Sequence, residues 1–212
     1  MSQPDTRQRL LDAAERLFAA EGFHNTSVRA VTSEAQANLA AVKYHFGSKE
    51  ALLEAVFERR LVPLNQLRRE RLEAVRAAAR QHGGRPVTTD VLRAFIEPTL
   101  AFRDHGPGAE AFVRLVGRAI AEPDDTIRKI FMQLVNPLFI LLYDTLGEAL
   151  PELSATERFW RLHFAIGSLS HAMCLAGHFQ ILPTGVTSLP DATALTAMML
   201  NFLTAGMEAP CA

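Results

Sequence analysis

The sequence predicts an all-α protein with a three-helix N-terminal head and a larger helical domain, about nine helices in all. Apolar residues recur every three or four positions nearly throughout the 212 residues, which is the spacing of a helix that buries one face. Polar capping residues, Gly and Pro stand where these periodic segments begin and end. No strand-like alternation or hairpin dipeptide interrupts the pattern.

Composition restricts the class of protein further. The 212 residues suit one or two domains, and 49% apolar with 21% charged residues is typical of a folded soluble chain. Two cysteines give no disulfide framework, and the first ten residues are too polar for a secretory signal. The longest apolar run, Leu134 to Tyr143, is shorter than the roughly 20 residues that span a bilayer. We therefore predict a cytoplasmic protein with no membrane partner.

The first fifty residues predict three short helices and the start of a fourth. An apolar stripe over residues 10–18 marks the first helix. Thr26 or Ser27 can cap a second helix, and Asn38 can cap a third. Gly47 suits the left-handed position that follows the third helix.

The rest of the chain is divided by Pro and Gly residues. A fourth helix, capped by Ser48, is predicted to end near Leu61, because Pro63 cannot continue it without a kink. A second arginine-rich helix should follow to about Arg80. Further helices are predicted over residues 89–104, 108–121, 125–149, 155–179 and 191–207.

Residues 25–50 carry the most specific pattern. Polar residues precede each helix, where backbone N–H groups and the helix dipole favour phosphate. The stretch Thr26 to Arg29, Ala35 with Asn38, and Tyr44 to Leu52 resemble the DNA-binding head of TetR-type repressors. The resemblance covers residues 5–62, with the helix-turn-helix at about 27–46. It implies that residues 63–212 form a helical ligand-binding and dimerisation domain.

A narrower resemblance joins two distant segments. Asn38 to Val42 and Phe159 to Phe164 are similar to the fatty-acid-responsive, PsrA-like subgroup, which implies a fatty acid or an acyl-CoA as effector. Two positions depart from the family pattern. Gln36 replaces the usual turn Gly, so that turn must adopt another geometry or carry strain. Lys43 replaces an aromatic residue, and a phosphate is the expected target of its cation.

The third helix, Leu39 to His45, is expected to lie in the major groove of DNA. Leu39 and Ala40 can contact thymine methyl groups, whereas Asn38 and Lys43 can form hydrogen bonds. In the alternative interpretation, Tyr44, His45 and Phe46 only pack a small core; we favour packing for Phe46 and leave His45 open. The DNA-binding candidates are Thr26, Ser27, Arg29, Asn38, Leu39, Ala40, Lys43, Tyr44, His45 and Lys49.

One head buries too little surface for useful specificity, so a homodimer on double-stranded operator DNA is predicted, with half-sites ~34–36 Å apart or a multiple of that spacing. A capping box from Ser154 to Glu157 begins the first of the last two long helices, which we predict as the dimer surface. Alternatively, both helices pack only within their own subunit. The interface candidates are Gly167, Ser168, Ala172, Ala176, Met198, Met199 and Phe202.

The C-terminal domain holds more large apolar residues than its helix contacts require, although most must be plain core. Together they permit an apolar cavity for a hydrophobic small-molecule effector. An acyl-CoA would also need cations at the mouth, for which Arg93, Arg103, Arg114 and Arg118 are candidates. The pocket candidates are Phe95, Phe102, Phe112, Leu115, Phe131, Phe139, Trp160, Phe164, His171 and Met173.

Histidine spacing offers the main catalytic or metal alternative. His171 and His178 are seven residues apart, but no Cys or acidic residue is spaced to complete a zinc site. We predict no catalytic residue, no metal and no cofactor. The predicted function is a repressor whose effector shifts the helix from Lys49 to Leu61 and so moves the heads. The alternatives are a constitutive DNA-binding dimer and, more distantly, an all-α lipid-binding protein or enzyme.

Overall fold

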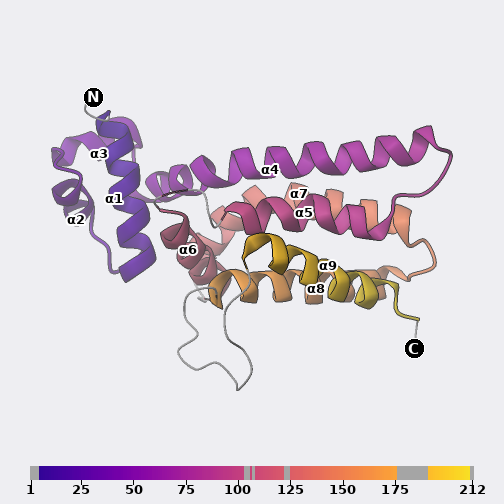
Figure 1. The fold of residues 1–212 in the computed structure, drawn as a ribbon. Helices are drawn as coiled ribbons and strands as arrows, with labels where there is room; N and C mark the ends of the chain where they lie inside the picture. Colours follow the sequence, from indigo (N-terminus) through magenta and orange to yellow (C-terminus); the bar gives the residue numbers. More distant parts are fainter. Residues whose placement is uncertain (1–4, 103–105, 107, 122–124, 176–190, 211–212) are drawn as a thin grey trace, which may run out of the picture. The chain divides into compact units, whose positions relative to one another are not determined.

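The computed structural model describes residues 5–102, 106, 108–121, 125–175 and 191–210. In this part of the chain, nine α-helices form and no strand is present (Figure 1). The predicted all-α fold is therefore confirmed. The helices are α1 (Thr6–Glu21), α2 (Val28–Glu34), α3 (Leu39–His45), α4 (Lys49–Gln81), α5 (Thr88–Phe102), α6 (Ala109–Ala121), α7 (Asp125–Ala149), α8 (Ala155–Leu175) and α9 (Ala192–Glu208).

The helix starts follow the capping residues of the sequence. Ser27 Oγ accepts a hydrogen bond from the Ala30 N–H at 3.0 Å, so Ser27 rather than Thr26 caps α2. Asn38 Oδ1 accepts from the Ala40 N–H at 2.6 Å at the start of α3. The predicted capping box is also confirmed, because the Glu157 N–H donates to Ser154 Oγ and Ser154 N–H donates to Glu157 Oε2.

The predicted end of the fourth helix near Leu61 is wrong. α4 is one helix of 33 residues from Lys49 to Gln81, with Pro63 inside it. A proline in a helix interior loses one backbone hydrogen bond and costs about 3 kcal/mol. Burial on both sides of the proline offsets that cost, since Phe57 and Leu72 are fully buried. The two helices predicted around Pro63 are therefore continuous.

The chain divides into two compact units. The head unit comprises Met1–Pro63 together with Gly106–Val135, and the body unit comprises Leu64–His105 together with Asn136–Ala212. The head unit is thus larger than the predicted domain 5–62, because it also contains α6 and the first part of α7. Helix α4 belongs to both units, and it changes from one to the other at Pro63.

The core of the head unit lies between α1, the first part of α4, α6 and α7. Phe18 of α1 and Phe57 of α4 are fully buried. The Phe57 ring centre is 6.1 Å from that of Phe112 and 5.7 Å from that of Phe131. Helix α6 packs along α1. These contacts explain why α6 is part of the head unit despite its distance in sequence.

In the body unit, α5 lies beside α9, and α8 also packs against α9 (Figure 1). Their shared core includes Leu92 and Leu100 of α5 and Leu203 of α9. Arg161 of α8 donates from Nη1 to the Met207 carbonyl at 2.8 Å, near the end of α9. This bond satisfies a carbonyl group that has no partner within its own helix.

Helix α7 is the most membrane-like element by composition. The segment Thr126–Ala149 is long and apolar enough to cross a membrane, by length and composition alone. A single helix of this kind is weak evidence of a membrane span. Soluble proteins also contain helices of this kind, and this one supplies core to both units. Ile127 and Phe131 are buried in the head unit, and Leu142 and Leu146 are buried in the body unit.

Candidate nucleic-acid interface

Helix α3 presents most of its residues to solvent. Tyr44 is 85% exposed, Leu39 is 49% exposed, and Ala40 and Lys43 are also exposed. Val42 is buried and holds the helix against the rest of the head unit. A seven-residue helix with one buried anchor and an exposed outer face can enter the major groove without unfolding the head.

The turn between α2 and α3 confirms the strain expected at Gln36. Gln36 has a φ of 50°, in the left-handed region that costs a residue with a Cβ about 1–2 kcal/mol. The Gln36 N–H donates to the Ser33 carbonyl and the Ala37 N–H to the Thr32 carbonyl, which together form a Schellman motif. Arg9 supports this turn, since its Nη1 donates to the Gln36 carbonyl at 3.4 Å.

Thr26 differs from the other DNA-binding candidates. Its side chain is fully buried, and its hydroxyl donates to the Gly22 carbonyl at 2.8 Å. Its surface is therefore not available to a phosphate, and its role is to close the turn after α1. Ser27 and Arg29, the next candidates along the chain, are exposed. The proposed interface accordingly begins at Ser27.

Lys49 and His45 are partly packed. The Lys49 ammonium lies 4.3 Å from the centre of the Phe23 ring, and burial lowers the pKa of Lys49 although the Glu50 carboxylate opposes this. The half-buried His45 ring meets the Tyr44 ring edge to face at 4.9 Å. Both residues hold the ends of α3 and α4 in place, and both keep some exposed surface.

A hollow of about 450 Å³ brings several candidates together on the head unit. It lies between the start of α1, the α2–α3 turn and α3, and Asn38, Ala40, Tyr44 and His45 line it. Arg9 lines it as well, although it was not among the predicted DNA-binding residues. Only the packing of α1 against the turn, which no local motif reveals, places Arg9 beside α3.

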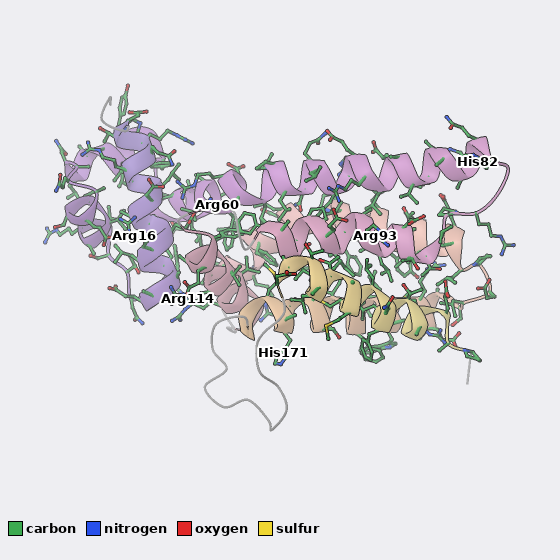
Figure 2. All side chains as sticks on the ribbon, in the orientation of Figure 1. Arg16, Arg60, His82, Arg93, Arg114 and His171 are labelled. Atoms are coloured by element: carbon green, nitrogen blue, oxygen red, sulfur yellow. The ribbon has the colours of Figure 1, made fainter. Side chains whose placement is uncertain are left out.

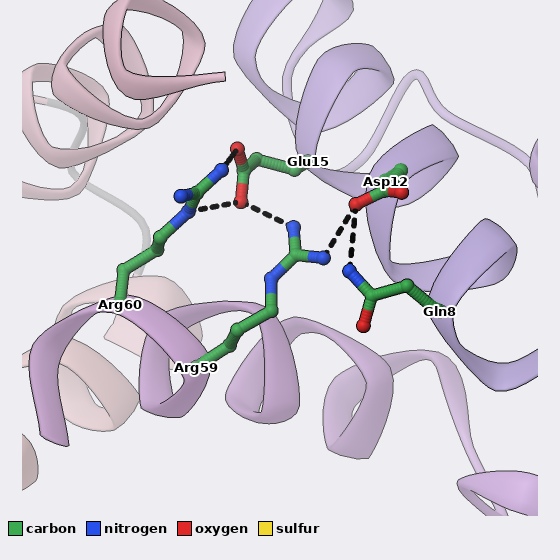
Figure 3. A network of polar contacts seen from close by, with 5 residues as sticks. All are labelled: Gln8, Asp12, Glu15, Arg59 and Arg60. Atoms are coloured by element: carbon green, nitrogen blue, oxygen red, sulfur yellow. Dashed lines mark hydrogen bonds and ion pairs between the residues drawn. The ribbon is translucent and has the colours of Figure 1, made fainter. Parts of the chain in front are cut away.

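A buried ionic network joins α1 to α4 within the head unit (Figure 3). Glu15 is 2% exposed and accepts from Arg59 Nη2 at 2.5 Å and from Arg60 Nη2 at 2.7 Å. The hydrogen bond to Glu15 raises the pKa of Arg60. A Cβ on Gly108, which precedes α6, would lie 2.5 Å from Glu15 Oε1 and from Arg60 Nη2. The absence of a side chain at Gly108 therefore leaves space for the network.

The pocket candidates do not gather in one place. Phe112, Leu115 and Phe131 are buried in the head unit. In the body unit, Phe95, Phe102, Phe139 and Met173 are half-buried, whereas Trp160, Phe164 and His171 are exposed on α8. Figure 2 shows the His171 side chain projecting away from the helices around it.

Helices α8 and α9 expose large apolar side chains in the body unit. Trp160 and Phe164 are spaced by four residues on α8, and Met198 and Phe202 are spaced by four on α9. Of the interface candidates, Gly167 is also exposed, Ser168 and Ala172 are half-buried, and Ala176 lies outside the described residues. Met199 is buried in the core of the body unit, so it packs within its own subunit.

The four arginines predicted at the mouth of an acyl-CoA pocket differ in exposure and in their partners. Arg93 and Arg114 are exposed, and Arg114 lies 3.7 Å from the Glu110 carboxylate (Figure 2). Arg118 donates to the Ala19 carbonyl at 3.1 Å at the C-terminal end of α1. Arg118 is therefore part of the head unit rather than the mouth of a body-unit pocket. Arg103 lies outside the described residues.

A small helical unit with a capped, solvent-facing α3 defines the chain as a helix-turn-helix DNA-binding protein. Two protein-family models match the chain. The one described as bacterial regulatory proteins, tetR family, matches residues 10–56, and the one described as the tetracyclin repressor-like C-terminal domain matches residues 93–206. The chain belongs to the TetR family of transcriptional regulators. The family description and the relatives named below are those of transcriptional regulators.

Named relatives match about a quarter of the chain. The nicotine-responsive transcriptional repressor HdnoR of Paenarthrobacter nicotinovorans is 44% identical over 55 residues, which cover 26% of this chain and 28% of that protein. The transcriptional regulator UidR of Escherichia coli K12 is 40% identical over 55 residues, with the same coverage of each chain. The matched part thus spans little more than a quarter of the length of these curated relatives.

Solved structures match nearly the whole chain. The transcriptional regulator FadR of Bacillus subtilis, in complex with stearoyl-CoA, has a TM-score of 0.68 at 14% identity and covers 94% of this chain and 98% of that one. The fatty acid degradation regulator FadR of Bacillus halodurans has a TM-score of 0.67 at 16% identity, covering 98% and 99%. At these identities the likeness shows the fold. The narrower PsrA-like resemblance stays a prediction.

Proposed function

We propose that this protein is a cytoplasmic, dimeric repressor that binds a two-fold operator and leaves it when a hydrophobic effector binds. The exposed α3, held by Val42 and by the strained turn at Gln36, is the observation that carries the DNA-binding part. The family of the chain supports the regulatory part. The effector is proposed to be a fatty acid or an acyl-CoA.

In the proposed complex, α3 lies in the major groove. Leu39 and Ala40 contact thymine methyl groups, and the Asn38 amide donates to a base or phosphate while its Oδ1 caps the helix. The remaining candidates fix the register on the phosphates. These are Ser27, Arg29, Lys43, Tyr44, His45 and Lys49.

Lys43→Ala is expected to weaken binding to the operator by about 10-fold or more, because it removes one phosphate contact from each head. The dependence of log affinity on log salt should become shallower by about 1 for each Lys43 removed. Fluorescence anisotropy on an operator fragment, selected from genomic DNA with the wild-type protein, measures both quantities.

Lys129→Ala is the matched control, because Lys129 is an exposed lysine on α7 in the same unit. This variant should bind the operator with the affinity of the wild type. Equal affinities for wild type and Lys43→Ala, with an unchanged salt dependence, would contradict the proposed role of Lys43.

The dimer is proposed to form through the exposed apolar face of α8 and α9, defined by Trp160, Phe164, Met198 and Phe202. Such a face is unfavourable in water and is typical of a surface that another chain covers. A second copy covers it with a self-complementary pair of helices, as two-fold symmetry requires. Two heads are then available for the two half-sites of an operator.

The effector is proposed to bind in the body unit and to act on the head unit through α4, which belongs to both. The fold of the FadR protein in complex with stearoyl-CoA supports the choice of acyl compounds. A saturating acyl ligand should weaken operator affinity by about 5–150-fold, the range of a typical coupling free energy of ~1–3 kcal/mol. Titration of the protein–operator complex with acyl compounds measures this coupling. Unchanged affinity with ligand bound would favour a constitutive DNA-binding dimer.

A further inference from the structure

Arg68 is a buried cation in the part of α4 that belongs to the body unit. Its side chain lies inside the unit, and the residue is 6% exposed. Nη1 donates to Asn65 Oδ1 at 2.9 Å, and Nη2 donates to Thr99 Oγ1 at 2.6 Å. The guanidinium carbon is 4.5 Å from the centre of the Phe95 ring. All of these partners are neutral.

No carboxylate of the described residues forms an ion pair with Arg68, and its Nε is buried without a hydrogen-bond partner. Neighbouring arginines on the same helix differ. Arg71 is partly exposed and lies 3.1 Å from Glu97, and Arg76 forms an ion pair with Glu148. The deepest arginine of this helix thus has no ion-pair partner among the described residues.

The Arg68 guanidinium has N–H donors that its two hydrogen bonds do not use. A guanidinium has five N–H donors, and the two hydrogen bonds to Asn65 and Thr99 use two of them. Burial lowers the pKa of Arg68 to about 9, so the group is still charged at neutral pH. A buried charge without a counterion is costly, and an anion that supplies one is bound correspondingly well.

We infer that Arg68 binds the carboxylate of an effector whose apolar part lies among the helices of the body unit. This inference rests on the proposed function and names the ligand class more closely. A carboxylate matches the planar fork of a guanidinium in charge and geometry. A free fatty acid carries such a group, whereas in an acyl-CoA the same carbon is a neutral thioester. The half-buried Phe95, beside the guanidinium, places apolar surface next to the charge.

The test compares three series of compounds with matched chains: dodecanoic and hexadecanoic acids, the corresponding alcohols, and the corresponding CoA thioesters. Operator release and the shift in melting temperature are measured for the wild type, Arg68→Met and Arg71→Met. The wild type should respond to the acid at concentrations at least 10-fold lower than to the alcohol. Arg68→Met should lose this preference while keeping its response to the alcohol. Arg71→Met, which removes a paired and more exposed arginine of the same helix, should keep the preference.

Arg68→Lys provides a second variant that retains the charge without the planar fork, and it should keep a reduced preference for the acid. A response to CoA thioesters alone would overturn the inference and leave the proposed function intact. Equal responses to acid and alcohol, or an undiminished preference in folded Arg68→Met, would overturn it as well. If no acyl compound of any series acts on the wild type, the effector part of the proposed function fails, and the inference fails with it.

Discussion

Replacing Glu15 by Gln is expected to lower the free energy of unfolding by about 3–5 kcal/mol, the cost of removing one partner from a buried ionic group. Glu15 is 2% exposed and its two oxygens neutralise both Arg59 and Arg60. A Gln side chain of nearly the same shape offers one acceptor and no negative charge, so the partly buried Arg59 and Arg60 would both lose this carboxylate, and Arg59 would keep only its ion pair with Asp12. The loss separates α1 from α4, and operator affinity should fall with it.

Urea denaturation followed by circular dichroism measures this free energy. Asp12→Asn is the matched control: Asp12 lies on the same helix and binds the same Arg59 at 2.6 Å, but its side chain is 43% exposed. Exposed ion pairs contribute about 0–1 kcal/mol, so the control should change stability by no more than that. A similar small change for both variants would show that solvent reaches Glu15 and that the network is not a buried one.

Phe202→Glu is expected to convert the proposed dimer to a monomer and to abolish tight operator binding. Phe202 is 72% exposed in the single chain and lies with Met198, Trp160 and Phe164 on the proposed dimer face. Association would bury the new carboxylate among apolar side chains without a partner, which costs several kcal/mol. A weakening of dimerisation by about 100-fold or more follows, since each 1.4 kcal/mol is a factor of 10.

Native mass spectrometry of the wild type and the variant measures the oligomeric state directly. Ile140→Glu is the control, because Ile140 is 56% exposed on α7 in the same unit but lies outside the proposed face. This control should remain a dimer and bind the operator. A wild type that is monomeric on operator DNA, or a Phe202→Glu protein that remains dimeric, would contradict the proposed interface.

Helix starts and turn geometry could be predicted from the sequence because they depend on neighbouring residues. Ser27 and Asn38 cap helices by hydrogen bonds to N–H groups two or three residues away. The backbone strain at Gln36 is equally local, because a residue with a Cβ is strained at a left-handed φ whatever surrounds it. The helix-turn-helix was recognisable for the same reason, as its pattern is contained in about twenty consecutive residues.

Burial, by contrast, depends on residues far away in the chain. Thr26 and Ser27 are both small polar residues beside a helix start, yet one is fully buried and the other exposed. Met198 and Met199 differ in the same way on α9. The continuity of α4 through Pro63 also depends on distant residues. The sequence shows the local cost of a proline inside a helix, but not the packing on both sides of Pro63 that offsets it.

The sequence by itself therefore determined the helical class, the caps and the DNA-binding motif of this protein, all of which arise from interactions between residues close together in the chain. Only the tertiary structure decided which residues share an environment. It placed α6 with the head, Trp160 and Phe164 at the surface, and Arg68 in the interior with no counterion among the residues that the structure describes. The reason is that solvent exposure and charge neutralisation are set by contacts between helices, and periodicity within one helix does not specify its neighbours.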